Sequence, residues 1–358
     1  MCIDHSLGEF IPRMATNHPS RPVRFAVVGA GWAGIRHLEA AEEVDTWVKV
    51  TSVCDTDQSQ LEEVADRFGV AKSTADFGEV VADDSVDVVD ICTPHDSHAA
   101  LALEAIASGK HVLVEKPIAS DLSDAKQMIQ GAEAAGLALG VAEHQVYDDP
   151  TRCLGRILDD GLLGEVVSVT ATWGFRAPQF SYPGRRAWLT DPERGGTGTW
   201  MLQGIHRVAQ VRALFGEVKS VYAVDSRTSS FTKGEIEATV TAVMKMRSGV
   251  PVVLIQSSEM AAPDALKGIT IFGERGSCTL KGDQVTVIDE GGAVLQEDSL
   301  LSDPVRPYAR QLEAFARHIV LGANFPTTGE WELGSLAVVE AGYLSIRRNE
   351  PISVANLI

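Results

Sequence analysis

The chain has 358 residues, of which 45% are hydrophobic and 22% are charged, and its formal net charge at pH 7 is −18. This acidic excess argues against nucleic acid and against an anionic membrane surface as partners, because phosphate groups are bound by basic surfaces. No stretch of the sequence approaches the roughly 18 apolar residues that span a bilayer. A chain of this length is expected to form two domains.

The start of the chain and the cysteines bear on the compartment. Residues 1–22 contain no apolar stretch of the signal-peptide type, and we expect them to form a flexible leader. The five cysteines include no C-x-x-C pair and are scattered along the chain, at positions 2, 54, 92, 153 and 278. An odd, scattered set suits a reducing compartment better than a disulfide framework, so we expect a cytoplasmic protein.

The region 23–146 alternates short apolar runs with amphipathic stretches. The apolar runs lie at 25–29, 48–55, 86–93, 111–116 and 137–144. Such continuous runs are typical of strands that are buried on both faces of a parallel sheet. Between them, patterns of period 3.6, such as Leu61, Val64 and Phe68, predict helices. The alternation predicts an α/β domain over 23–146 with right-handed crossovers.

The first apolar run leads into the motif Gly29-x-Gly31-x-x-Gly34, which opens a predicted helix. In such a turn the first glycine permits the tight bend, the second lets the backbone approach a pyrophosphate, and the third allows helix and strand to pack closely. Asp55 ends the second run, where a carboxylate accepts hydrogen bonds from ribose hydroxyls. The motif predicts a Rossmann domain whose dinucleotide contacts are Gly29, Gly31, Trp32, Ala33, Gly34 and Asp55.

Asp55 also bears on the choice of dinucleotide. A 2′-phosphate would meet its negative charge, and the following Thr56 and Asp57 offer no arginine to neutralise that phosphate. We therefore expect NAD as the cofactor, with NADP disfavoured.

Three later strands of this domain also end in polar residues, and the carboxyl ends of parallel strands form the ligand crevice of an open α/β sheet. Lys116 is placed there as a proton donor or acceptor whose pKa burial could lower; the alternative is a surface lysine paired with Glu115. The remaining crevice residues that we expect to contact the cofactor are Thr93, Pro94, His95, Glu115 and Glu143. We expect His144 and Tyr147 to contact substrate.

The spacing of the histidines in this domain does not predict a metal site. His95 and His98 have a spacing that could share an ion, but no third ligand is evident, so we expect none. His37 lies in the first predicted helix, where packing is the simpler interpretation.

The pattern changes after about residue 164. Residues 165–174 open a strand-rich region, and Val240, Ala242 and Met244 recur at every second position, as in a strand with one buried face. Helical patterns return at 308–321 and 332–347. We expect a second domain over 147–358, built on a mostly antiparallel sheet.

Two stretches carry a family resemblance. GAGWAGIRH at 29–37 and TPHDSHAALALEAIASGKHVLVEKPIA at 93–119 resemble the Gfo/Idh/MocA family of glucose–fructose oxidoreductase and inositol dehydrogenase, and the similarity extends over about 24–354. The resemblance implies a Rossmann domain joined to an α/β domain with a large, mostly antiparallel sheet, whose open face pairs copies into a homo-oligomer. It also implies that Lys116 hydrogen-bonds the reacting hydroxyl, with Glu115 and Pro117 setting its position.

The family's second catalytic element is a glycine run followed by an Asp and, four residues later, a His on a helix. The corresponding stretch here is GGTGTWMLQGIHR at 195–207, so Leu202 stands where the family often has the carboxylate. His206 is the candidate general base, since an imidazole titrates near neutral pH. The alternative for His206 is a packed helix histidine.

A local excess of arginine surrounds this element in an otherwise acidic chain. The arginines are Arg176, Arg185, Arg186, Arg194 and Arg207, interleaved with Trp173, Phe175, Trp188 and Trp200. They could hold a substrate carboxylate in bidentate contacts, or they could form surface and interdomain pairs. We take Arg176, Arg185 and Trp188 as candidate substrate contacts.

These observations favour an NAD-dependent dehydrogenase that oxidises a secondary alcohol of a small cyclic polyol, sugar or glycoside, with Lys116 and His206 as catalytic residues. One alternative substrate is a carboxylated cyclic diol of the phthalate dihydrodiol type. A second alternative is redox-neutral chemistry with tightly held NAD. A third is a non-catalytic NAD-bound sensor, which the loss of the Asp at position 202 allows.

Overall fold

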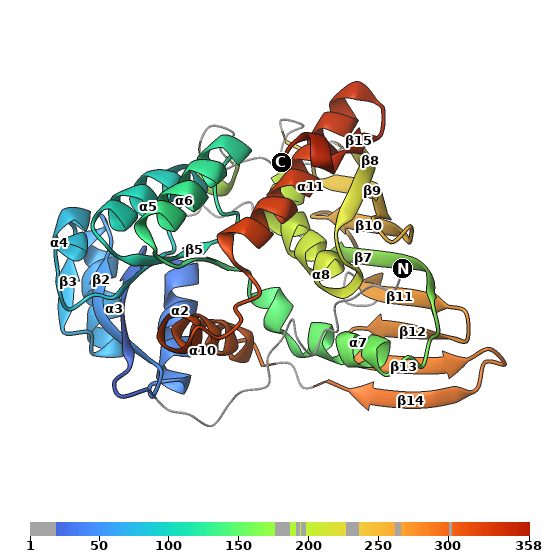
Figure 1. Ribbon diagram of the computed structural model, residues 1–358, viewed down its shortest axis with the longest axis horizontal. Helices are drawn as coiled ribbons and strands as arrows, with labels where there is room; N and C mark the ends of the chain where they lie inside the picture. The colour runs from blue at the N-terminus through green and yellow to red at the C-terminus, as the bar shows by residue number, and fades with distance from the viewer. Residues whose placement is uncertain are drawn as a thin grey trace. The chain divides into compact units, whose positions relative to one another are not determined.

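A computed structural model describes residues 19–175, 187–190, 194, 198–226, 236–261, 266–300 and 303–358. The strands in these ranges form one sheet of six strands and one sheet of nine (Figure 1). No helix within them is long and apolar enough to cross a membrane. Most of the expected leader lies outside the described residues.

The six-stranded sheet is parallel and has the order β3-β2-β1-β4-β5-β6. Its strands are β1 (Val23–Val28), β2 (Val48–Cys54), β3 (Lys72–Thr74), β4 (Val88–Ile91), β5 (His111–Glu115) and β6 (Leu139–Ala142). Every residue of β4 and β6 is buried, as the continuous apolar runs predicted. The strand order reverses between β1 and β4, which is where ligands bind in sheets of this kind.

Helices lie on both faces of this sheet. They are α2 (Trp32–Glu43), α3 (Gln58–Phe68), α4 (Phe77–Val81), α5 (His98–Ala107) and α6 (Leu122–Ala135). Figure 1 shows α5 and α6 on one side of the sheet and α2 on the other. Local sequence sets the helix ends: the Asp121 carboxylate accepts the backbone N–H groups of Ser123 and Asp124 to begin α6, and Gly136 ends it at φ 65°.

The nine-stranded sheet has the order β14-β13-β12-β11-β7-β10-β9-β8-β15. Its strands are β7 (Val166–Gly174), β8 (Val218–Ser226), β9 (Thr239–Met246), β10 (Pro251–Ser257), β11 (Gly268–Gly273), β12 (Gly276–Lys281), β13 (Gln284–Asp289), β14 (Val294–Ser299) and β15 (Ile352–Ser353). All neighbouring pairs are antiparallel except β7 and β10. The predicted α/β fold, with a parallel Rossmann sheet and a mostly antiparallel second sheet, is therefore confirmed.

One face of the nine-stranded sheet is apolar and buried. In β9, Val240, Ala242, Met244 and Met246 are buried, whereas the intervening Val243 and Lys245 are exposed. The remaining α-helices of the described residues are α7 (Asp149–Asp159), α8 (Ile205–Phe215), α10 (Arg306–Leu321) and α11 (Gly329–Arg348). Short turns of 3-10 or π type are η1 (His95–Ser97), η2 (His144–Tyr147), η4 (Ala187–Thr190), η5 (Trp200–Gly204) and η6 (Val354–Asn356).

Contacts divide the described chain into two units. The first unit holds 19–147 and 303–333, and the second holds the described part of 148–302 and 334–358. The sequence analysis assigned 303–333 to the second domain, and the structure differs. The helix α10 contacts α2 through its apolar side, which includes the buried Tyr308, Leu312 and Phe315. Periodicity predicted the helix correctly but carries no information about which sheet covers its apolar side.

Candidate active site

Three glycines shape the turn between β1 and α2, each for a different reason. Gly29 has φ +99°, and a Cβ there would lie 2.6 Å from the Cys92 carbonyl oxygen. A Cβ on Gly34 would collide with the Gly29 carbonyl oxygen, so helix and strand could not pack. A Cβ on Gly31 would meet no protein atom within 4 Å. The protein leaves space at position 31, which is what the close approach of a ligand to the backbone requires.

Asp55 lies directly beside this turn. Its Oδ2 accepts the backbone N–H of Ala30 at 2.7 Å, and its Oδ1 accepts the backbone N–H of Asp57 at 2.9 Å. The carboxylate is therefore held between the glycine turn and the end of β2. Gly31, as the N-cap of α2, supplies no side chain to cap that helix, which suits an anion at its N-terminus. Turn, helix end and carboxylate together fit the pyrophosphate and ribose of NAD.

The residues after β4 are held to the residues after β5 by one histidine. His98 is buried, with Nδ1 2.9 Å from the Pro117 carbonyl oxygen and Nε2 3.0 Å from the Thr93 carbonyl oxygen. Both ring nitrogens are thus engaged, so the arrangement gives no support to a metal shared by His95 and His98. Burial, with His98 and Lys116 nearby, holds the pKa of His95 well below its usual range.

Lys116 follows β5 and is joined to Pro117 by a cis peptide bond. Its backbone N–H donates to Glu115 Oε2 at 3.1 Å, and its side chain is partly buried. Burial lowers the pKa of Lys116, while the carboxylates of Glu115 and Glu143 oppose that shift. A partly desolvated ammonium whose charge two nearby carboxylates stabilise can donate a hydrogen bond to a reacting oxygen or exchange a proton with it.

The residues after β6 have different roles. Glu143 is fully buried, and its Oε1 accepts the backbone N–H of Gln145 at 3.0 Å. The His144 ring stacks on Tyr308 with centroids 4.1 Å apart. Tyr147 is buried, its hydroxyl lies 3.4 Å from Thr327 Oγ1, and burial raises its pKa. Tyr147 therefore packs within the first unit, and its substrate contact stays a prediction.

In the second unit, His206 belongs to α8, directly after the π turn η5. His206 and Leu202 are both buried. A π turn of this kind is frequent at functional sites, and the sequence pattern did not predict it. Because residue 202 is a leucine, no carboxylate stands at the position where the family often has an Asp.

A buried carboxylate that the sequence analysis missed anchors the start of this helical segment. Glu237 Oε1 accepts the backbone N–H of Trp200 and the hydroxyl of Tyr343, each at 2.9 Å. The Tyr343 oxygen in turn accepts the backbone N–H of Met201 at 3.1 Å. A Cβ on Gly198, which has φ +78°, would collide with the same carboxylate. Glu237 thus holds the otherwise free N–H groups at the N-terminus of the segment that carries His206.

The arginine-rich element is only partly described. Arg176, Arg185 and Arg186 lie outside the described residues, and Arg194 is exposed. The Arg207 guanidinium lies 3.5 Å from the centroid of the Trp173 ring and donates to Gln210 Oε1 at 3.0 Å. Trp188, in η4, is partly buried. Arg207 therefore has partners within its own unit. These contacts do not favour Arg207 as the residue that binds a substrate carboxylate.

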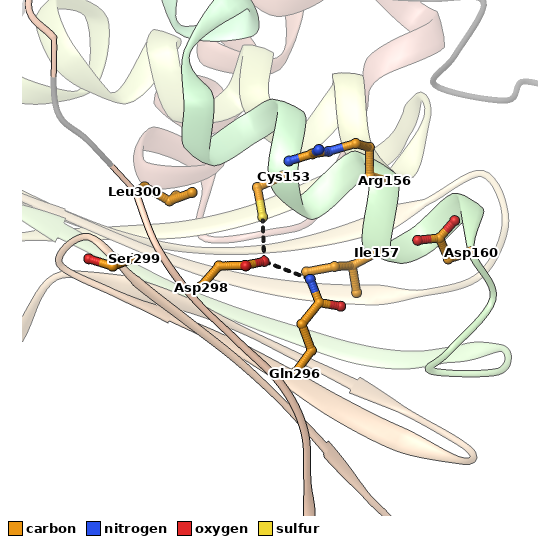
Figure 2. A pocket seen from close by; sticks show the side chains of 8 residues that line it. All are labelled: Cys153, Arg156, Ile157, Asp160, Gln296, Asp298, Ser299 and Leu300. Carbon is orange, nitrogen blue, oxygen red and sulfur yellow. Dashed lines mark hydrogen bonds between the residues drawn. The ribbon is translucent and has the colours of Figure 1, made fainter.

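A separate cavity of about 290 Å³ lies in the second unit, between α7 and β14 (Figure 2). One arginine, Arg156, and two aspartates, Asp160 and Asp298, line it. Cys153 points its thiol at Asp298, at 3.9 Å, and burial raises the pKa of this thiol. A protonated thiol in a pocket with an excess of negative charge is not a nucleophile. The cavity includes none of the predicted site residues.

Comparison with known proteins agrees with this site. A family model described as an oxidoreductase family with an NAD-binding Rossmann fold matches residues 23–143, and a model of the GFO/IDH/MocA C-terminal domain matches residues 151–279. D-Apiose dehydrogenase from Paraburkholderia graminis is 28% identical, over 96% of this chain and 92% of that protein. Inositol 2-dehydrogenase from Rhizobium meliloti is 27% identical, over 93% of this chain and 99% of that protein.

A solved structure extends the likeness to three dimensions. An oxidoreductase from Agrobacterium radiobacter, in complex with NAD+, L-tartaric acid and magnesium, superposes with a TM-score of 0.84 and 25% identity, covering 94% of this chain and 99% of that one. The glycine turn, Asp55 and the two family matches lead to one conclusion. This chain is an NAD-binding oxidoreductase that belongs to the Gfo/Idh/MocA family.

Proposed function

We propose that the protein oxidises a secondary alcohol of a cyclic polyol, sugar or glycoside to a ketone, reversibly, with NAD as the hydride acceptor. The observation that carries the proposal is Lys116, a partly buried lysine under the influence of two nearby carboxylates, at the same carboxyl edge of the sheet as the glycine turn. The relatives named for apiose and inositol support a polyhydroxylated substrate.

The cofactor would be held by the first unit. The glycine turn and the N-terminus of α2 would take the pyrophosphate, and Asp55 would accept ribose hydroxyls. When bound, NAD supplies a nicotinamide ring that accepts a hydride. Thr93, Pro94, His95 and Glu143 remain proposed cofactor contacts.

We assign the proton chemistry to two side chains. Lys116 would donate a hydrogen bond to the reacting oxygen and stabilise the negative charge that develops on it as the hydroxyl proton departs. His206 would accept that proton as general base. His144 and Trp188 remain proposed substrate contacts.

A second candidate substrate is a carboxylated cyclic diol. Leu202 in place of the family's Asp and the tartaric acid in the Agrobacterium structure favour it. It depends on Arg176 and Arg185, because Arg207 is already paired with Trp173 and Gln210.

The test is the appearance of NADH absorbance across a panel of polyols, sugars, glycosides and cyclic diol acids. We expect turnover with at least one neutral cyclic alcohol. Turnover only with the diol acids, lost in an Arg185→Ala variant, would favour the second candidate instead. Protein that binds NAD but forms no NADH with any alcohol would overturn the proposal in favour of a sensor or of redox-neutral chemistry.

A further inference from the structure

The proposed chemistry does not use a cluster of buried ionisable side chains that adjoins Lys116. The cluster consists of His37, Asp90 and Glu115. His37 of α2 is fully buried, and its Nδ1 lies 2.7 Å from Oδ2 of Asp90 on β4. On the other side of the ring, Nε2 lies 3.4 Å from Oε1 of Glu115 at the end of β5, which is an ion-pair contact without the alignment of a hydrogen bond. Asp90 is itself 1% exposed, so this contact is shielded from water. One imidazole therefore bridges two carboxylates inside the first unit.

The geometry favours the charged form of the ring. A neutral imidazole has one N–H group, so one of its nitrogens would face a carboxylate with a lone pair. Away from water, two carboxylates on one neutral ring would leave uncompensated negative charge. An imidazolium donates a hydrogen bond to Asp90 through Nδ1 and brings its positive charge to 3.4 Å from Glu115 through Nε2. It offsets one of these two buried negative charges, while the Lys116 ammonium lies near the carboxylates of Glu115 and Glu143.

The other groups around His37 add no charge. The Cys92 thiol lies 3.6 Å from Nδ1, and burial raises its pKa to about 12. The Tyr308 ring of α10 lies 5.7 Å from the imidazole, and burial raises its pKa as well. Both groups stay protonated and neutral at neutral pH. The negative charges in contact with the His37 ring are therefore those of Asp90 and Glu115. In agreement, the pKa of His37 is raised well above its usual range and that of Glu115 is lowered to about 2.

The two carboxylate oxygens of Glu115 connect this cluster to Lys116. Oε1 faces His37, and Oε2 accepts the backbone N–H of Lys116 at 3.1 Å. We propose that His37 is a permanent imidazolium that ties Asp90 to Glu115 and so fixes the Glu115 carboxylate, with its charge, beside Lys116. His37 is then a positioning residue for the lysine, and this inference rests on the role proposed for Lys116.

The first test reads the protonation state without any turnover. Full-length protein labelled with ¹⁵N-histidine is followed by NMR from pH 6 to 9, and the His37 signal is assigned by its loss in a His37→Gln variant or by its contact with the Tyr308 ring. We expect both ring nitrogens of His37 to carry protons throughout. His95, whose pKa burial holds well below its usual range, is the neutral reference in the same spectra. A neutral or titrating His37 would overturn the proposal, whatever the substrate is.

The second test separates charge from packing. Replacing His37 by Gln strands two buried carboxylates, and we expect turnover to fall at least about tenfold with an altered pH profile. The double variant His37→Gln/Asp90→Asn removes one anion together with the cation, so turnover should recover in part. His111→Gln, the same substitution at the opposite end of β5, is the matched control and should keep the wild-type pH profile.

Turnover and melting temperature are compared in wild type, His37→Gln and His37→Gln/Asp90→Asn, which form a mutant cycle. Its outcomes can be told apart from a failure of the proposed function. If the melting temperature recovers in the double variant but turnover does not, His37 has a structural role only and the positioning role is wrong. If no alcohol is oxidised even by the wild type, the proposed function fails, while the NMR measurement and the melting-temperature cycle still decide whether the charged bridge exists.

Discussion

At the scale of single residues, the candidate site depends on carboxylates that neighbouring donors keep in place. Asp55 accepts two backbone N–H groups beside the glycine turn, and Glu115 divides its oxygens between His37 and the backbone of Lys116. Asp55 thereby links local geometry to cofactor choice, and Glu115 links it to pH dependence.

Glu115 makes the free energy of unfolding depend on pH in the acid range. Its pKa is lowered from 4.5 to about 2 in the folded state, so its stabilisation is present above pH 4.5 and is lost as the pH falls toward 2. Glu115→Gln lacks this contribution. We expect the gap in melting temperature between wild type and variant to narrow from pH 5 to pH 3 in calorimetry. The same substitution at Glu42, exposed on α2, is the control, and a gap that stays constant would contradict the assignment.

Asp55 should decide between NAD and NADP. Replacing it by Ala removes an acceptor for the ribose and the charge that repels a 2′-phosphate. We expect the Kd for NAD to rise about tenfold, since a hydrogen bond to a charged group is worth roughly 1.5–3 kcal/mol, while the Kd for NADP falls. Isothermal titration with each dinucleotide checks both. An unchanged ratio of the two constants would remove Asp55 from cofactor recognition.

At the scale of elements, the helical segment that carries His206 is held by one buried acid and one tyrosine. In Tyr343→Phe the hydroxyl that bridges Glu237 and the Met201 N–H is lost, and we expect about 1–2 kcal/mol of destabilisation in urea unfolding. Tyr222→Phe is the matched control, because the Tyr222 hydroxyl bonds Asn349 at the protein surface, and it should cost within about 0.5 kcal/mol. Equal costs would mean that the Glu237–Tyr343 pair does not anchor the segment.

What the sequence predicted at this scale was local, and what it missed was long-range. The strand ends at Asp55 and Lys116, and the helices over 308–321 and 332–347, follow from apolar periodicity and spacing within a few residues. The covering of the first sheet by α10, the bridge from His37 to Asp90 and Glu115, and the anchoring of Trp200 by Glu237 join residues far apart in the chain. A polar residue inside an apolar run, such as Asp90 in VVDI, was the available signal for the bridge, but it named no partner.

At the scale of the whole molecule, the exposed face of the nine-stranded sheet is a candidate surface for self-association. Val243 pairs with Tyr222 on β8 and with Val253 on β10, and Val224 on β8 and Phe272 on β11 are also exposed. Exposed apolar side chains on one face favour burial against a second copy. We propose a homo-oligomer, a dimer or a tetramer, formed through this face.

The oligomer is tested by light scattering after size exclusion. We expect the wild type to be larger than a monomer and Val243→Glu to shift it toward the monomer, because a charge would be buried in the contact. Val294→Glu, at an exposed valine of the edge strand β14, should leave the mass unchanged. A monomeric wild type, or equal effects of the two substitutions, would contradict this use of the sheet.

The proposed chemistry depends on Lys116, which would stabilise the reacting oxygen of an alcohol that NAD oxidises. It is tested by comparing turnover and NAD affinity in Lys116→Ala with those in Lys49→Ala, a substitution at an exposed lysine of β2. We expect Lys116→Ala to lose at least roughly 10²-fold in kcat while its Kd for NAD stays within about twofold of wild type, and Lys49→Ala to change neither. Wild-type turnover in Lys116→Ala would contradict it.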